Sequence, residues 1–587
     1  MCILRTIKHL RDLGIFSELD VHFTEFLATL SDQVNDELLL GAVLASYFTA
    51  QGHICVDLSV QAGQLFPLQS ELSVSQFSCP SLSKWLDSLQ NCNVVGRPGD
   101  YTPLILDRHR LYLYRYWDYE QQLAVQIRQR SSRQPAEVDF SILEEGLSRL
   151  FPAQDNESDN HQEIAARTAV LRHFCVISGG PGTGKTFTVV KILILLLEQN
   201  PNLNIALAAP TGKAAIRLRQ AIAQTLPYLN CAPDLKAAIP QETYTIHRLL
   251  LGNPAEHHHF RHQKGSFLPY NVVVIDEASM VNLALMTQLA QAIPQSARWI
   301  LLGDKDQLTS VEAGTVLSDL CDAKNRLQDN IVFLEHNYRF SDKSGIWALA
   351  QAVKPGQSDN AWRILKSESY PEVIWHYLIP SEGLPANLMD LIVASFARCL
   401  KESQPEKILQ QFDNFRILCA THWGRYGVET LNRRIEEALN KKGLIRLGSR
   451  WYHGRPIMIT CNDYGLKLFN GEIGIILKNL SNEGELKAFF LSPEGELRTF
   501  WPSRLPEHKT VFAMTIHKSQ GSEFDNVLML LPEQMSPLLT RELIYTGITR
   551  ARQSVSIWGN ERVFKQAVSQ KISRLSGLGD ALEMGNE

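Results

Sequence analysis

A glycine-rich segment at residues 179–186, which reads GGPGTGKT, constrains this fold more than any other feature. It follows a short apolar run at 175–178 and precedes a stretch with helical character that starts near Thr186. Phosphate-binding loops need this order, because glycines let backbone N–H groups close on phosphate oxygens and the helix N-terminus adds positive potential. We therefore expect Lys185 to contact the β- and γ-phosphates of a nucleotide and Thr186 to ligate Mg²⁺. The residues predicted to bind the nucleotide through this loop are Gly179, Gly180, Pro181, Gly182, Thr183, Gly184, Lys185 and Thr186.

Short apolar runs recur around the loop and predict an α/β fold. Each run is followed by turn or helix-start residues, the alternation typical of a parallel sheet covered by helices. In the first half the runs are 175–178, 205–209, 272–275 and 299–302, and a second block has 416–420 and 527–531. Between residues 451 and 501, strand-like pieces are broken by Asn-Asp, Asn-Gly and Gly, which predicts a small β-rich insertion.

Polar residues at the ends of two predicted strands complete a hydrolytic site. Asp276 and Glu277 follow the run 272–275, so Asp276 is predicted to hold Mg²⁺ through water and Glu277 to polarise the attacking water. Gln307 follows the next strand and could contact both the γ-phosphate and this water. Arg339 and Arg550, far along the chain, are candidates for stabilising charge on the γ-phosphoryl group. An arginine from a second domain would make hydrolysis depend on domain closure.

Composition excludes several classes of protein. The 587 residues include ten cysteines with no CxxC pair, which argues against zinc or iron–sulfur sites. The histidines at 257–259, with His262, favour a polar surface loop over a metal site. No signal peptide is evident and the longest apolar run, 192–197, is too short to span a membrane, so we expect a cytoplasmic protein with no membrane association.

The net charge of the chain neither predicts nor excludes binding to nucleic acid. The chain carries 58 basic and 62 acidic side chains, a net charge of −4, and a nucleic-acid binder needs only a local basic track. Residues 541–574 hold seven Lys or Arg against two acids. A DNA track and an ordinary solvated helix face explain this bias equally well.

The order of motifs resembles that of superfamily 1 helicases and, within them, the RecD family, which supplies the alpha chain of exodeoxyribonuclease V. After GGPGTGKT come APTGKAA (209–215), TIH (245–247), IDEA (275–278), GDKDQ (303–307), NYR (337–339), TIHKSQGSE (515–523) and YTGITRA (545–551). The resemblance spans about residues 160–552. It implies two RecA-like domains with parallel sheets, an SH3-like β-rich insertion and a mainly helical N-terminal domain.

The resemblance also implies residue roles. Gln162 corresponds to a glutamine that reads adenine, Tyr338 to a tyrosine that stacks near the base, and Glu523 to a residue near the ribose. The positions that correspond to DNA-facing or DNA-coupled residues of the family are Thr211, Lys213, His247, Thr515, His517 and Gln520.

The resemblance to the RecD family also implies partner subunits. Only residues 1–178 precede the loop, fewer than in stand-alone RecD-like helicases, which favours a subunit that joins RecB-like and RecC-like chains in a heterotrimer. Such a complex uses ATP and Mg²⁺ to move 5′ to 3′ on single-stranded DNA and to process double-stranded ends. No separate nuclease cluster is evident, so cutting is predicted to belong to a partner chain. The alternatives are a stand-alone helicase on DNA or RNA and an idle binding subunit.

The expected domain order follows from these motifs. We expect a partner-docking domain over 1–120, a linker over 121–160 and a RecA-like domain with the phosphate loop over 161–335. A second RecA-like domain is expected over 336–450 and 511–587, with the β-rich insertion over 451–510. The aromatic segment 110–117 resembles the family's N-terminal region, while its alternation alone predicts a core strand.

Overall fold

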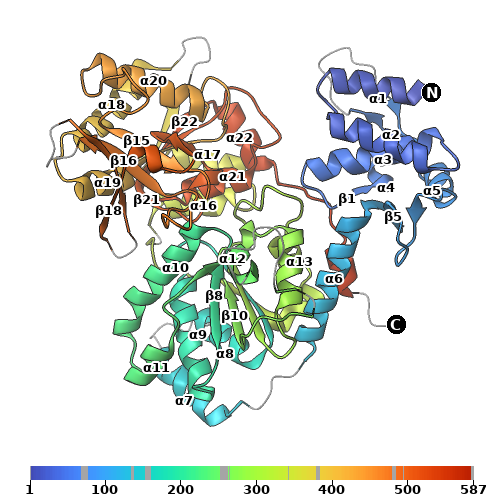
Figure 1. Cartoon of the computed structure of the whole chain (residues 1–587), viewed down its shortest axis with the longest axis horizontal. Helices are drawn as coiled ribbons and strands as arrows, with labels where there is room; N and C mark the ends of the chain where they lie inside the picture. Colours follow the sequence, from blue (N-terminus) through green and yellow to red (C-terminus); the bar gives the residue numbers. More distant parts are fainter. Residues whose placement is uncertain are drawn as a thin grey trace.

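The computed structural model describes residues 2–67, 77–133, 138–152, 160–251, 262–263, 265–341, 343–378, 384–478, 484–492 and 495–583. In these ranges the chain forms a small N-terminal domain, two α/β domains and a β-rich domain that lies beside the second α/β domain (Figure 1).

The first α/β domain is built on a six-stranded parallel sheet in the order β12-β7-β11-β10-β8-β9. Its strands are β7 (Phe174–Gly179), β8 (Ile205–Ala209), β9 (Tyr244–Thr245), β10 (Val272–Ile275), β11 (Arg298–Gly303) and β12 (Ile331–Leu334). Successive strand residues point to opposite faces, so a sheet covered on both faces needs unbroken apolar runs. Val273 joins the core on one face and Val274 the core on the other. The parallel α/β prediction is confirmed.

Two layers of helices cover this sheet. One face carries α7 (Phe140–Leu150), α8 (His161–Leu171), α9 (Lys185–Gln199), α10 (Gly212–Thr225) and α11 (Pro233–Ala238). The other carries α6 (Tyr114–Ser131), α12 (Ile246–Leu251), α13 (Leu283–Ala292), α14 (Val316–Asp322) and α15 (Lys324–Leu327).

Helices α6 and α7 correct the linker predicted over 121–160. Arg130 of α6 is fully buried, and its Nη2 donates to the carbonyls of Ile293 at 2.6 Å and Ala290 at 3.2 Å, at the end of α13. Gln295 donates to Gln126 of α6 at 2.6 Å. The polar residues that resemble a linker in sequence therefore bind a neighbouring helix. The polar run 154–160 lies, apart from its last residue, outside the described residues.

The second α/β domain has a five-stranded parallel sheet in the order β13-β22-β21-β14-β20. Its strands are β13 (Val373–Tyr377), β14 (Phe415–Cys419), β20 (Ala513–Thr515), β21 (Phe524–Leu530) and β22 (Ala551–Gly559). One face packs against α16 (Gly345–Val353), α17 (Ser358–Lys366), α21 (Arg541–Ile548) and α22 (Glu561–Ser569). The other packs against α18 (Ala386–Leu400), α19 (Pro405–Asn414) and α20 (Val428–Lys441).

The β-rich insertion is an antiparallel sheet in the order β18-β17-β16-β15-β19. Its strands are β15 (Arg455–Ile459), β16 (Ile473–Lys478), β17 (Leu486–Leu491), β18 (Leu497–Phe500) and β19 (His508–Thr510). Ile475 and Phe489 of the insertion share a hydrophobic cluster with Phe412 and Phe512 of the second α/β domain. The insertion is thus anchored to that domain.

The N-terminal domain combines helices with a small sheet. Its helices are α1 (Cys2–Asp12), α2 (Glu18–Leu30), α3 (Asp36–Ala50), α4 (Leu58–Gln61) and α5 (Leu82–Gln90). The sheet has the order β1-β6-β5-β4, with β1 (Cys55–Asp57), β4 (Val95–Gly96), β5 (Leu104–Asp107) and β6 (Arg110–Leu113), and β2 (Leu65–Phe66) pairs with β3 (Phe77–Ser78). The core strand predicted over 110–117 is corrected, because β6 ends at Leu113 and α6 begins at Tyr114.

The C-terminal segment after α22 leaves the second α/β domain and returns to the N-terminal domain (Figure 1). Ile54 donates its backbone N–H to the carbonyl of Leu575 at 2.8 Å, and Leu575 donates to His53 Nδ1 at 3.0 Å. Helix α23 (Leu578–Glu583) then packs on α6 and α14. This corrects the assignment of residues 571–583 to the second RecA-like domain.

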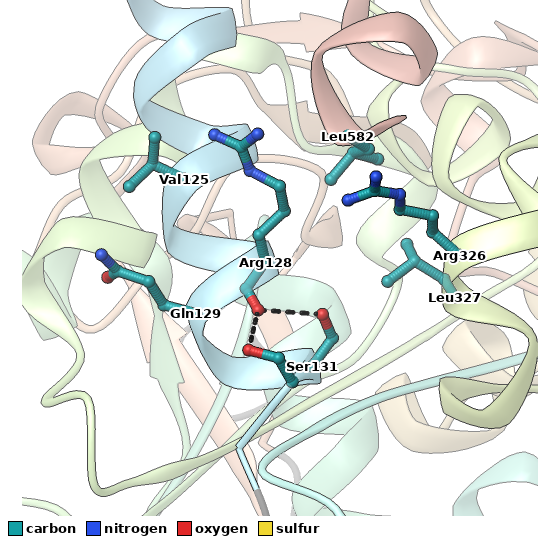
Figure 2. Close-up of a pocket in the computed structure, with 8 residues that line it drawn as sticks. Val125, Arg128, Gln129, Ser131, Arg326, Leu327 and Leu582 are labelled. Carbon is teal, nitrogen blue, oxygen red and sulfur yellow. Dashed lines mark hydrogen bonds between the residues drawn. The ribbon is translucent and has the colours of Figure 1, made fainter. Parts of the chain in front are cut away.

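A cavity of about 300 Å³ marks the joint between α6, α15 and α23. Figure 2 shows Val125 and Arg128 of α6, Arg326 and Leu327 of α15, and Leu582 of α23 around it. At this cavity, α6 and the C-terminal helix α23 meet α15 of the first α/β domain.

Candidate nucleotide and nucleic-acid site

The phosphate loop connects β7 to α9 in the predicted geometry. Gly182 and Gly184 have φ of 86° and 80°, a left-handed conformation that favours glycine. A Cβ at Gly182 would come within 2.6 Å of Arg339 Cβ. Helix α9 begins at Lys185, so its free N–H groups face the loop. The loop therefore needs glycine both for its backbone and for the approach of the Asn337–Arg339 segment.

Lys185 lies back across this loop. Its Nζ donates to the carbonyl oxygens of Gly179 at 2.6 Å and Gly180 at 3.1 Å. These contacts hold the Lys185 ammonium at the loop. Because phosphate oxygens are stronger hydrogen-bond acceptors than backbone carbonyls, the ammonium can exchange these contacts for a bound phosphate.

The two acids Asp276 and Glu277 directly follow β10. Asp276 Oδ1 accepts the backbone N–H of Glu277 at 2.9 Å, and Glu277 has a φ of 52°, which is uncommon for a residue with a side chain. Burial raises the pKa of Asp276 to about 6, the charge of Glu277 adds to this rise, and Lys185 opposes it. Adjacent carboxylates in a buried setting are a good fit for a divalent cation, which would supply the compensating charge.

Residues predicted to surround the base flank the loop. Gln162 of α8 is buried and its Nε2 donates to the carbonyl of Thr183 at 3.2 Å. A Cβ at Gly184 would come within 2.4 Å of Gln162 Nε2 and 3.6 Å of Tyr338 Cδ2. Tyr338 donates its backbone N–H to Gly182 at 2.8 Å while 57% of its surface stays exposed. An exposed ring beside the loop can stack on a base.

Gln307 and Arg550 meet across the two α/β domains. Arg550 Nη2 donates to Gln307 Oε1 at 3.1 Å, and Gln307 Nε2 donates to Asp304 Oδ2 at 3.0 Å. The hydroxyl of Tyr545 also donates to Asp304 Oδ2, at 3.1 Å. Gln520 reaches back to donate to the carbonyl of Leu308 at 2.8 Å. The strand end carrying Gln307 is therefore bound on several sides by the second domain.

Arg339, which lies between β12 and α16, contacts Glu523 before β21. Its Nη2 lies 2.5 Å from Glu523 Oε1, while its Nη1 is buried and has no hydrogen-bond partner among the described residues. Burial alone would raise the pKa of Glu523, but the charges of Arg339, Arg217 and Arg550 outweigh it and lower the pKa to about 2. An unsatisfied guanidinium nitrogen beside the phosphate loop is a fit for a phosphate oxygen.

Three of the residues predicted to face DNA, Thr211, Lys213 and Thr515, lie beside the β-rich insertion. Thr211 caps α10, its Oγ1 accepting the N–H of Ala214 at 3.2 Å, and Thr515 Oγ1 accepts the N–H of Lys518 at 3.2 Å. Burial, together with the charge of neighbouring Arg217, lowers the pKa of Lys213 to about 7.

The insertion covers both of these caps. A Cβ at Gly212 would come within 2.8 Å of Phe469 Cβ, and Lys518 Nζ donates to Asn470 Oδ1 at 3.3 Å. His247 is exposed on α12, and His517 is half-buried beside Lys518.

The basic stretch 541–574 does not form one track. Arg550 points into the domain interface, Arg574 donates to the carbonyls of Glu312 and Gly314, and Lys565 pairs with Asp359 and Glu561. The structure therefore favours separate roles over a shared DNA-binding surface.

Metal and membrane predictions are tested only in part. The histidines at 257–259 lie outside the described residues, and His262 Nδ1 lies 3.2 Å from the carbonyl of Phe267. Among the described residues, no group of three or more His, Cys, Asp or Glu side chains could hold a metal by itself. Within the same ranges, no helix has both the length and the apolar character needed to cross a bilayer.

Comparisons with known proteins decide the family. Three family models match: the N-terminal domain of RecBCD enzyme subunit RecD over residues 12–112, an AAA domain over 162–313 and the UvrD-like helicase C-terminal domain over 510–557. RecBCD enzyme subunit RecD from Mycolicibacterium smegmatis is 36% identical, over 96% of this chain and 97% of the relative. The chain belongs to the RecD family.

Other relatives differ in how much of their length this RecD-family chain covers. RecBCD enzyme subunit RecD from Haemophilus influenzae is 32% identical, over 99% of this chain and all of the relative. The ATP-dependent RecD2 DNA helicase from Deinococcus radiodurans is 29% identical, and the match covers 79% of this chain but only 57% of that helicase.

Sequence reasoning missed Tyr545 as a site residue. It lies in the motif 545–551, yet only the fold shows its hydroxyl on Asp304 and 2.8 Å from where a Cβ of Gly180 would lie. Because Tyr545 opens the motif that contains Arg550, the sequence could have indicated that it lies at the same site.

Proposed function

We propose that this RecD-family chain is an ATP-driven 5′-to-3′ DNA helicase and the motor subunit of a RecBCD-type complex that processes double-stranded DNA ends. The contact between Gln307 and Arg550 carries the proposal, because it joins the nucleotide site to the second domain at the position where γ-phosphate charge would build. Hydrolysis can then alter the domain interface, which is what a motor requires.

The chemistry follows from the chain's own groups. Glu277 polarises water for in-line attack on the γ-phosphorus, without a covalent intermediate. Lys185 leaves the loop carbonyls for the phosphates, and Arg339 and Arg550 stabilise the charge that develops on the γ-phosphoryl oxygens. Thr186 and Asp276 would hold Mg²⁺, which supplies charge neutralisation when bound.

Other residues are assigned to binding. Gln162 and Tyr338 bind the base end of the nucleotide, and Glu523 lies near the ribose, where it also holds Arg339. Thr211, Lys213, His247, Thr515 and His517 face the DNA strand, with backbone contacts and stacking as the physical basis of grip.

The proposal of partner subunits rests on how much of each relative this chain covers. The chain spans 97% of the mycobacterial relative named as a RecBCD subunit, but little more than half of the RecD2 helicase. We propose on this basis that the chain acts in a cytoplasmic heterotrimer with RecB-like and RecC-like subunits, with the N-terminal domain as the docking element and nuclease activity in a partner. A stand-alone helicase is the alternative.

Co-purification with ATPase measurement tests this function. Tagged full-length chain should recover two partner chains, and the complex should hydrolyse ATP faster when single-stranded DNA is added. Lys185→Gln should keep the partners and lose this chain's share of the hydrolysis. Recovery of a lone active monomer would support the alternative, and unchanged hydrolysis in Lys185→Gln would refute the motor assignment.

A further inference from the structure

A cavity of about 360 Å³ lies between the first α/β domain and the β-rich insertion. Tyr244, Arg248 and Tyr270 of the first α/β domain line it, and Tyr464 of the insertion closes it. Its volume is at the lower end of the range typical of small-ligand sites. None of these residues belongs to the nucleotide site.

The cavity has the chemistry of a base-binding site. Three tyrosine rings offer π faces on which any nucleobase can stack. The Arg248 guanidinium carbon lies 5.4 Å from the Tyr244 ring centroid, so a cation is available beside the stack. The Tyr244 hydroxyl donates to Glu242 Oε2 at 2.8 Å, which fixes the ring and places a carboxylate at one side of the cavity. Phosphates would therefore pass on the Arg248 side.

The position of the cavity joins it to the proposed DNA path. Two of its lining residues flank His247, a residue proposed to face DNA: Tyr244 lies before it in β9, and Arg248 follows it on α12. On the opposite wall, the rings of Tyr464 and Phe469 lie 6.0 Å apart, and Phe469 covers Gly212 between the proposed DNA-facing residues Thr211 and Lys213. The cavity thus lies at the end of that row.

We infer that this cavity receives one unstacked nucleobase of single-stranded DNA, gripped between Tyr270 and Tyr464 with Arg248 near the backbone. The inference rests on the proposed function, because it extends the DNA path. Since stacking is insensitive to base identity, the site grips a strand of any sequence.

Single-stranded DNA binding by full-length protein, in its complex where one forms, tests the inference. Fluorescence anisotropy with an oligo-dT probe should show binding weakened about 5- to 100-fold in Tyr270→Leu and in Tyr464→Leu, the range expected for loss of one base–aromatic stack. Tyr270→Phe and Tyr464→Phe keep the ring and should bind as the parent does. Tyr228→Leu, which removes a ring that is 87% exposed on the same domain, is the matched control and should change nothing.

A second measurement does not depend on the folding of variants. In parent protein, 2-aminopurine placed at successive positions of the oligo-dT should be quenched at one position, and the quenching should disappear in Tyr464→Leu. Leucine variants that bind like the parent, with quenching retained, would overturn the inference. If instead the parent fails to bind single-stranded DNA or to hydrolyse ATP in response to it, the proposed function itself fails.

Discussion

The guanidinium of Arg550 donates from Nη2 to Oε1 of Gln307 across 3.1 Å. The two residues lie in different α/β domains, and Arg550 is 3% exposed and also donates to the carbonyls of Thr546 and Ser522. The backbone acceptors fix the arginine within its own domain, so its contact with Gln307 reports the position of the other domain.

Arg550→Ala should nearly abolish this chain's share of the ATP hydrolysis stimulated by single-stranded DNA. An arginine that stabilises the phosphoryl transition state contributes roughly 10³-fold or more to kcat. Steady-state hydrolysis by the purified complex measures the effect. Arg562→Ala, an exposed arginine on α22, is the control and should hydrolyse ATP at the parent rate.

Tyr545→Phe should uncouple the two domains in part. The variant keeps the buried ring and loses only the hydrogen bond to Asp304, a change worth about 1 kcal/mol in stability. We expect stimulated hydrolysis to fall by about fivefold, because about 1 kcal/mol that holds Asp304, and through it Gln307, is lost. Thermal unfolding and hydrolysis are measured together. A normal rate with lowered stability would show that the hydroxyl is only structural.

Arg339→Ala should lower both stability and hydrolysis. It leaves Glu523 buried with less compensating charge, which costs about 1–3 kcal/mol. The double variant Arg339→Ala with Glu523→Gln should recover part of the stability, because the carboxylate that lost Arg339 is then neutral, while Arg217 loses the charge of Glu523. Its hydrolysis should stay low, since the transition-state arginine is still missing. Recovery of hydrolysis in the double variant would contradict the assignment of Arg339.

Glu120 predicts a pH dependence of the C-terminal docking. Its carboxylate accepts hydrogen bonds from Gly577 N–H at 2.8 Å and Ser576 Oγ at 3.0 Å, and burial raises its pKa to about 7 from 4.5. Because the folded-state pKa is raised, the contribution of Glu120 to stability is full below pH 4.5 and is lost as pH rises through about 7.

Glu120→Gln removes this titration. We expect it to unfold at a higher temperature than the parent at pH 8 and at a similar temperature at pH 5, with a difference of about 2 kcal/mol. Thermal unfolding at the two values of pH measures the shift. The same exchange at Glu144, whose pKa is lowered by its hydrogen bond to Arg167, should bring no gain at pH 8. A parent protein that is equally stable at both values would argue against a buried, titrating Glu120.

The sequence predicts those parts of the fold that depend on local pattern. Apolar runs gave β8 and β10 with their observed bounds, because strands covered on both faces require consecutive apolar residues. The spacing of glycines around Lys185 likewise predicts the loop. Gln307 and Arg550 were predicted separately, but only the fold shows that they meet, since 243 positions separate them.

Other features depend on contacts that no local pattern encodes. Arg130 and Gln126 are polar in sequence and therefore resemble linker residues, yet both bind α13 and the turn that follows it. The return of Leu575 to Ile54 joins segments from opposite ends of the chain. Such pairings arise from tertiary packing, which overrides local propensity.

Unwinding of tailed duplexes tests the central claim most directly. The purified complex is mixed with ATP, Mg²⁺ and duplexes that carry a single-stranded tail at either the 5′ or the 3′ end of the loading strand. We predict that Lys185→Gln in this chain abolishes unwinding of the 5′-tailed duplex while the complex stays assembled. Unwinding of the 5′-tailed duplex at the parent rate by the Lys185→Gln complex would contradict it.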